Sequence, residues 1–171
     1  MPASDHELEH AGNQLAEQLL NAGLSLVTAE SCTGGWVAKV LTDKAGSSAY
    51  VVGGLVTYSN EAKQKLLGVT DASLDNHGAV SEPVVREMVA GALATTGAGV
   101  AVAISGVAGP GGGSKEKPVG TVWFAWGSSV ETTEATVRHF SGDRDQVRRQ
   151  AVLVALQGVS ELLTQARVLS Q

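Results

Sequence analysis

The stretch "LSLVTAESCTGGWVAKV", residues 24–40, predicts a strand, a tight turn and a helix in direct succession. Its first part, Leu24 to Glu30, is a short apolar run with the length of a buried strand. From Gly34 onward the sequence is typical of a helix. Ser31 stands at the junction, beside the free N–H groups of the helix start. A hydroxyl at this place is either a helix cap or a nucleophile.

The elements on both sides of this stretch predict an α/β fold. Apolar spacing, caps and glycine stops predict helices at residues 5–22, 34–46, 59–68 and 81–97, and a long one from about residue 141 to Val168. Strands are predicted at residues 24–30, 49–58, 100–109, 119–128 and 133–140. This order predicts one domain, residues 1–171, built as a three-layer α/β/α sandwich. Its sheet is expected to be mixed and mostly parallel, with about five strands.

Composition narrows the class of protein. The chain has 171 residues, of which 43% are hydrophobic and 17% charged, as expected for a globular domain with a core. A net charge of −5 argues against a nucleic-acid partner, and no apolar run approaches the roughly 18 residues of a membrane span. The polar start of the chain is unlike a signal peptide. Cys32, the only cysteine, fits a reducing compartment, so we expect a cytoplasmic location.

The segment "HELEH", His6 to His10, matches the H-E-x-x-H pattern of zinc proteases. Helical phase places both histidines on the polar stripe, opposite Leu8 and Leu15. We therefore interpret the segment as a solvated helix face and expect no metal site.

The glycine-rich segment "SGVAGPGGGSKEKPVG", residues 105–120, is neither a Walker A loop nor a dinucleotide fingerprint. It lacks the Gly-Lys-Ser/Thr triplet, and a strand rather than a helix is predicted to follow it. Two alternatives remain for this loop: either its N–H groups would form an anion site for a phosphate, or the loop is a flexible turn between strands.

Several polar residues are predicted at the carboxyl ends of strands. These are Ser31, Tyr58 and Ser105, with Lys63 in the first turn of the next helix. Because parallel strands end at a shared edge, we expect these side chains to converge there. Each also has a structural interpretation, since Ser31 would serve as a helix cap and Lys63 as a solvated helix lysine. Cys32 is expected to be a small buried residue rather than a nucleophile.

A nucleophilic serine requires a base, and Lys63 is the best-placed candidate. His77 is predicted in a loop and His139 near the end of a late strand. An ordinary lysine has a pKa of about 10.4, so a working base near pH 7 requires a pKa lowered by about 3 units. Burial has to supply most of that decrease.

Five blocks of the chain resemble the C-terminal domain of the competence/damage-inducible protein CinA, in its stand-alone form. They are "TAESCTGG", "GGLVTYSNEAK", "AVSEPVVREM", "ISGVAGPGGGS…KPVGTV" and "FSGDRDQVRRQA", and they span Thr28 to about Val152. The resemblance implies hydrolysis of the carboxamide of nicotinamide mononucleotide to nicotinic acid mononucleotide and ammonia. It further implies a serine/lysine pair that works without metal or cofactor.

The resemblance also implies roles for individual residues. Ser31 would be the nucleophile and Lys63 its base, with the hydroxyls of Tyr58 and Ser105 relaying the proton or orienting the lysine. The remaining candidates bind substrate: the N–H groups around Cys32, Thr33 and Gly34 would hold the oxyanion, the loop with Gly109, Gly111 and Gly112 would cradle ribose and phosphate, and Arg144 would contact the phosphate.

A second interpretation comes from a different class of protein. In it the chain is a nucleotide- or partner-binding accessory domain without turnover, related to competence and DNA-damage proteins. The presence of both Ser31 and Lys63 favours the interpretation as an enzyme. The expected partner is the small-molecule substrate, and a homo-oligomer is compatible with the sequence.

Overall fold

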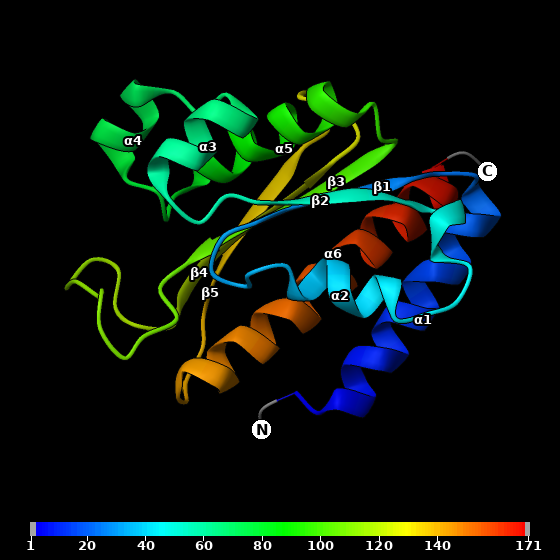
Figure 1. The fold of residues 1–171 in the computed structure, drawn as a ribbon, viewed down its shortest axis with the longest axis horizontal. Coiled ribbons are helices and arrows are strands. Elements are labelled where there is room, and N and C mark those ends of the chain that lie inside the picture. The colour runs from blue at the N-terminus through cyan, green and yellow to red at the C-terminus, as the bar shows by residue number, and fades with distance from the viewer. Residues whose placement is uncertain (1–2, 170–171) are drawn as a thin grey trace.

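A five-stranded mixed sheet forms the centre of the computed structural model, which describes residues 3–169 (Figure 1). The strands are β1 (Leu26–Glu30), β2 (Val51–Val56), β3 (Val100–Gly106), β4 (Thr121–Gly127) and β5 (Glu134–His139), in the spatial order β2-β1-β3-β4-β5. Strand β1 pairs in parallel with β2 and β3, whereas β4 runs antiparallel to both β3 and β5. The predicted mixed sheet is therefore confirmed.

Helices cover both faces of the sheet, as the three-layer prediction requires (Figure 1). They are α1 (Asp5–Ala22), α2 (Trp36–Thr42), α3 (Asn60–Leu67), α4 (Asp71–His77), α5 (Glu82–Thr96) and α6 (Arg144–Leu169), with a short 3₁₀ turn, η1, at Ser47–Ala49. Helices α1, α2 and α6 lie on one face, and α3, α4 and α5 lie on the other. Among the helices of residues 3–169, none combines the length and apolar character needed to cross a bilayer.

Strand β1 is fully buried along its whole length, because both of its faces are covered. Leu26 packs into the cluster beneath α1, α2 and α6, while Val27 and Ala29 point into the cluster beneath α5. Successive side chains of β1 thus pack on opposite faces of the sheet, as they do in a strand that is covered on both sides. It fixes the position of the turn that follows Glu30.

Helix α3 lies directly against α5. A Cβ atom at Gly91 of α5 would clash with the main chain of Leu67, so only glycine permits this approach. Of the two cap candidates in the sequence, Ser59 and Asn60, it is Ser59 that caps α3, by accepting a hydrogen bond from the Ala62 N–H at 3.0 Å, and Gly68 ends the helix at φ 70°. Lys63 is thereby held in the first turn of α3.

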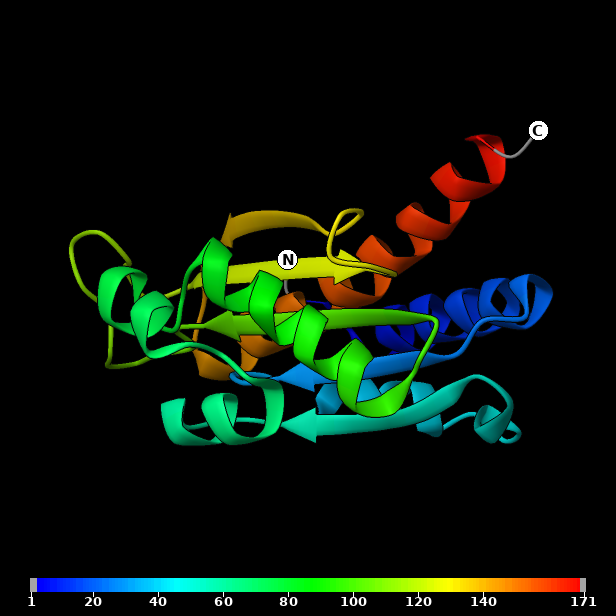
Figure 2. The ribbon, with the colours of Figure 1, turned by 90° about the horizontal axis from the view of Figure 1, so that it is seen from above.

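Strands β1, β2 and β3 end at the same side of the sheet, where α3 and loop 107–120 also lie (Figure 2). One element there differs from expectation. His77, predicted in a loop, is the last residue of α4, whose N-cap Thr70 accepts a hydrogen bond from the Ser73 N–H at 3.1 Å. This end of the sheet carries the polar residues that the sequence singled out.

Candidate active site

A buried lysine and a buried serine are in direct contact at the carboxyl end of the sheet. Lys63 Nζ lies 2.8 Å from Ser31 Oγ. It also donates to the carbonyl oxygens of Thr57, at 2.6 Å, and Tyr58, at 3.2 Å. The lysine is only 1% exposed and the serine 7%. Lys63 is therefore not a solvated helix lysine, and burial lowers its pKa to about 8.

Glu30 caps helix α2, which leaves the neighbouring serine free. The fully buried carboxylate accepts hydrogen bonds from the N–H groups of Val37, at 2.9 Å, and Ala38, at 3.1 Å. It also accepts from the hydroxyls of Thr28 and Thr33. The first-turn N–H groups of α2 are thus occupied, so the alternative in which Ser31 caps this helix is wrong.

The turn after β1 is tied down through its main chain. The N–H of Ser31 donates to the Ile104 carbonyl of β3 at 3.0 Å, and the N–H of Gly34 donates back to the Ser31 carbonyl at 3.0 Å. Gly34 and Gly35 have φ angles of 62° and 96°, which few residues other than glycine adopt. One of the three N–H groups expected around the oxyanion, that of Gly34, is therefore already engaged in the turn.

Cys32 is next to the candidate nucleophile but has the properties of a buried structural residue. Its side chain is 6% exposed, and burial raises the pKa of its thiol to about 12. A thiol with this pKa stays protonated at neutral pH, as the sequence interpretation expects.

A cavity of about 200 Å³ opens beside the serine and the lysine. It is lined by Ser31, Cys32, Tyr58, Lys63, Ala79, Val80, Ser105, Gly106, Ala108 and Arg144. Three of the lining residues, Ala79, Val80 and Ala108, have small apolar side chains. Ser31, Tyr58, Lys63 and Ser105 thus converge at one strand edge, as predicted.

The two supporting hydroxyls make contacts other than those expected. Ser105 Oγ donates to the Ala79 carbonyl at 2.9 Å and so joins β3 to the segment before α5. The Tyr58 hydroxyl accepts from Arg144 at 3.1 Å, and the side chain is 62% exposed. It is the carbonyl of Tyr58, not its hydroxyl, that contacts Lys63.

Arg144, the first residue of α6, lies at the mouth of the cavity and is exposed. Its guanidinium donates to the Gly109 carbonyl at 2.8 Å as well as to Tyr58. Gly111 and Gly112 are exposed in the same loop and are not among the residues that line the cavity. Of the predicted phosphate ligands, Arg144 lines the cavity, whereas Gly109 is buried outside the lining and is joined to Arg144 through its carbonyl.

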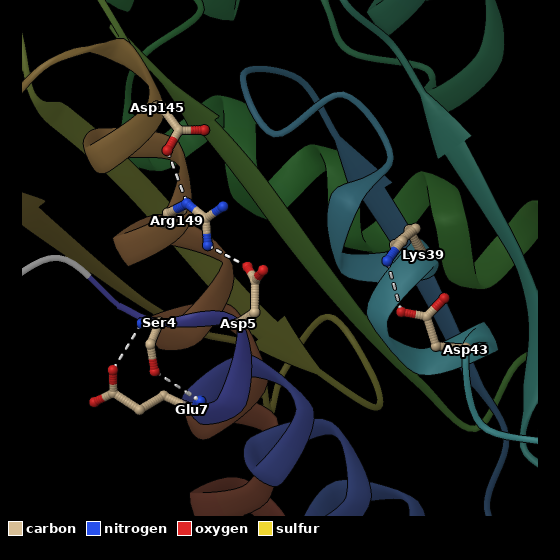
Figure 3. A network of polar contacts seen from close by, with 7 residues as sticks. All are labelled: Ser4, Asp5, Glu7, Lys39, Asp43, Asp145 and Arg149. Atoms are coloured by element: carbon tan, nitrogen blue, oxygen red, sulfur yellow. Dashed lines mark hydrogen bonds and ion pairs between the residues drawn. The ribbon is translucent and has the colours of Figure 1, made fainter.

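A larger hollow, of about 580 Å³, lies between α1, α2 and α6, but it has no comparable pair. Figure 3 shows ion pairs made by four of its lining residues: Lys39 pairs with Asp43 at 2.8 Å, and Arg149 pairs with Asp5 and with the neighbouring Asp145. The hollow is thus lined by surface ion pairs and has no buried nucleophile beside a base.

The histidines of the "HELEH" segment, His6 and His10, are exposed on α1. Across residues 3–169 no three His, Cys, Asp or Glu side chains gather as a metal site would require. The segment has the solvated character that its helical phase predicts.

Comparison with known proteins finds similar proteins over most of the chain. A model of the CinA C-terminal domain matches residues 8–163. The nicotinamide-nucleotide amidohydrolase PncC of Escherichia coli K12 is 57% identical over 154 residues, covering 90% of this chain and 93% of that protein. PncC of Pseudomonas putida is 51% identical over 152 residues, covering 89% and 94%. The crystal structure of the competence/damage-inducible protein CihA from Agrobacterium tumefaciens superposes with a TM-score of 0.89 at 40% identity, covering 96% and 99%.

Proposed function

The chain belongs to the CinA C-terminal domain family, and from that premise we propose that it is a nicotinamide-nucleotide amidohydrolase. In this proposal it hydrolyses the carboxamide of nicotinamide mononucleotide through an ester on Ser31. Relatives named for this activity are 50–57% identical over about nine-tenths of the chain. The observation that carries the mechanism is the 2.8 Å contact between Lys63 Nζ and Ser31 Oγ.

The surroundings of Lys63 suit a general base. A neutral amine has two hydrogens and one lone pair. The carbonyls of Thr57 and Tyr58 accept the two hydrogens, which leaves the lone pair for the hydroxyl of Ser31. With a pKa of about 8, roughly a tenth of the lysine is neutral at pH 7.

The reaction then proceeds in two halves. Lys63 takes the proton of Ser31, and Oγ attacks the carboxamide carbon to form a tetrahedral oxyanion. The ammonium of Lys63 returns the proton to the leaving nitrogen, so ammonia departs and the nucleotide remains as an ester on Ser31. Lys63 next deprotonates a water that attacks the ester. The ester C–O bond breaks as Ser31 Oγ takes that proton back from Lys63, and nicotinic acid mononucleotide leaves and releases its acid proton to solvent.

The oxyanion site is assigned to the turn rather than to helix α2. Glu30 already accepts hydrogen bonds from the first-turn N–H groups of α2, and the Gly34 N–H donates to Ser31. The N–H groups of Cys32 and Thr33 are the members of the predicted set that remain for this role. They would donate to the negative oxygen that develops as Ser31 attacks.

The size of the cavity indicates which part of the nucleotide would lie inside it and which part outside. A volume of about 200 Å³ is below that of a site for a drug-sized ligand, so it suits the pyridine ring with its carboxamide. The ribose and phosphate would extend past the mouth, where Arg144 offers a charge-assisted contact. The N–H groups around Gly109, Gly111 and Gly112 would complete this outer part.

The binding-module interpretation gives no reason for a buried lysine at this place. All three partners of Lys63 Nζ are oxygens of neutral groups. Burying an ammonium without a counter-charge destabilises a fold. A lysine that must lose its proton to act explains the arrangement.

The experiment measures ammonia and nicotinic acid mononucleotide released from nicotinamide mononucleotide by the purified protein. Acid quenching followed by peptide mass spectrometry looks for the nucleotide ester on Ser31. We expect the ester in the native protein, and neither ester nor ammonia in Ser31→Ala. Ammonia release by Ser31→Ala at the native rate would overturn the mechanism, and its absence from the native protein would overturn the function.

A further inference from the structure

One guanidinium group holds the turn that carries Ser31, without lining the cavity. Arg148 of α6 donates from Nε to the Cys32 carbonyl at 3.0 Å and from Nη2 to the Thr33 carbonyl at 3.3 Å. The same group lies over the Trp36 ring, 5.3 Å from its centroid. Two successive carbonyls are thus fixed from one direction by one planar side chain.

The orientation of a carbonyl sets the orientation of the next N–H group. In a trans peptide the C=O of one residue and the N–H of the next point in opposite directions. Because Arg148 binds the carbonyl of Cys32, the N–H of Thr33 is directed away from Arg148. The Ser31 carbonyl is turned toward the Gly34 N–H, which directs the N–H of Cys32 the opposite way.

We propose that Arg148 is a positioning residue for the oxyanion site, one that aims the Thr33 N–H at the carboxamide oxygen of a substrate at Ser31. The proposal rests on the acyl-enzyme function described above. Arg148 acts through the turn, since it does not line the cavity.

The residues around Arg148 fit this role. A Cβ atom at Gly34 would lie 3.3 Å from Arg148 Nη2, so glycine at this position leaves room for the guanidinium against the turn. A lysine in place of Arg148 would be a point charge without the planar fork that reaches two carbonyls at once. The geometry therefore requires a guanidinium and not merely a positive charge.

The neighbouring arginine provides a matched control. Arg149 also lies over the Trp36 ring, 5.1 Å from its centroid, but its hydrogen bonds go to Asp145 and Asp5. Arg149→Ala therefore removes a stacked guanidinium from the same ring without touching the turn carbonyls. Arg148→Ala removes the stacking and both carbonyl contacts.

The experiment determines kcat and KM for nicotinamide mononucleotide in Arg148→Ala, Arg148→Lys and Arg149→Ala. Loss of one oxyanion donor lowers kcat by about 100-fold or more, so we expect a decrease of about 10- to 100-fold in Arg148→Ala with KM changed by less than about 3-fold. Arg149→Ala should keep kcat within about 2-fold, and Arg148→Lys should recover only part of the loss. Added ethylguanidine should raise kcat of Arg148→Ala and leave the native enzyme unchanged.

Thermal unfolding of each variant separates positioning from folding. If Arg148→Ala does not fold, Arg148→Lys carries the test. Native kcat in the folded Arg148 variants, or equal losses in Arg148→Ala and Arg149→Ala, would overturn the proposal. Failure of the function itself would appear differently, as the absence of ammonia release by the native protein, and failure of the acyl-enzyme mechanism as native-like ammonia release by Ser31→Ala.

Discussion

Lys63 Nζ lies 2.8 Å from Ser31 Oγ, although 32 positions separate the two residues in the chain. The contact is produced by the register of two parallel strands. Glu30 at the end of β1 is opposite Val56 at the end of β2, so the turn after one strand meets the helix after the other. The reactive pair is therefore a consequence of topology, and its chemistry depends on how far burial lowers the pKa of the lysine.

The first prediction concerns the pH dependence of catalysis. Because the neutral form of Lys63 is the active one and its pKa is about 8, kcat/KM should rise about tenfold per pH unit below that value and level off above it. Initial rates between about pH 6 and pH 10 at constant ionic strength measure this profile. Lys63→Arg should be nearly inactive throughout, since a guanidinium keeps its proton. Near-native kcat in Lys63→Arg would show that a positive charge suffices there.

The second prediction concerns stability. The pKa of Lys63 is lowered in the folded protein and is about 10.4 in the unfolded chain. Between about pH 8 and pH 10.4 the unfolded chain binds the extra proton, so the native protein gains stability as pH rises through this window. Lys63→Met has no such group. The Tm of Lys63→Met minus that of the native protein should therefore decrease from pH 8 to pH 10, and it should be constant below pH 8.

A constant difference in Tm up to pH 10 would contradict this prediction. Lys65→Met is the matched control, because Lys65 is an exposed residue of the same helix, with a side chain that is 73% exposed. Its Tm difference from the native protein should show no such decrease between pH 8 and pH 10.

Most of the fold was predictable from apolar patterning, because most elements bury one face or two. Helix α4 was not: its segment "DASLDNH" contains no buried residue, so no apolar period marks it. The convergence of Ser31, Lys63 and Ser105 was predictable because parallel strands end at one edge. Their exact partners were not, since Lys63 is held by main-chain carbonyls, which leave no trace in a sequence.

Two further residues of the site were missed for the same reason. Glu30 binds N–H groups of α2, and Arg148 binds carbonyls of the turn. No local signal marks Glu30, because it lies six positions before Trp36, the first residue of α2, and glutamate is not among the preferred N-cap residues. Arg148 had none either, since a long amphipathic helix offers several arginines and the sequence does not tell which one faces the turn.

The third prediction concerns the thiol beside the nucleophile. Burial raises the pKa of Cys32 to about 12, so the thiolate is scarce at neutral pH. Cys32→Ala should keep most of the native kcat, whereas Ser31→Ala should lose activity. Iodoacetamide should also fail to inactivate the native enzyme. Full activity in Ser31→Ala with none in Cys32→Ala would move the nucleophile to the thiol.

The fourth prediction concerns Glu30. In Glu30→Gln the amide would turn its own hydrogens toward an N–H or hydroxyl donor, because all four partners of the carboxylate are donors. An unsatisfied buried donor costs about 1–3 kcal/mol, so we expect a loss of that size in the free energy of unfolding by urea. Glu61→Gln, which removes an exposed ion pair with Lys65, should change it far less. Equal effects of the two substitutions would show that the Glu30 cap contributes little.

The last prediction concerns substrate recognition by Arg144. If its guanidinium binds the phosphate, Arg144→Ala should raise KM for nicotinamide mononucleotide by about tenfold or more, as loss of a charge-assisted contact implies. Nicotinamide riboside lacks the phosphate, so its kcat/KM should change little in the same variant. The ratio of the two kcat/KM values is thus the quantity to measure. Tyr58→Phe is the control, because it removes the hydroxyl that accepts from Arg144 and keeps the guanidinium. A ratio that stays native in Arg144→Ala, or falls equally in Tyr58→Phe, would place the phosphate elsewhere, with the N–H groups of the glycine loop as the next site to test.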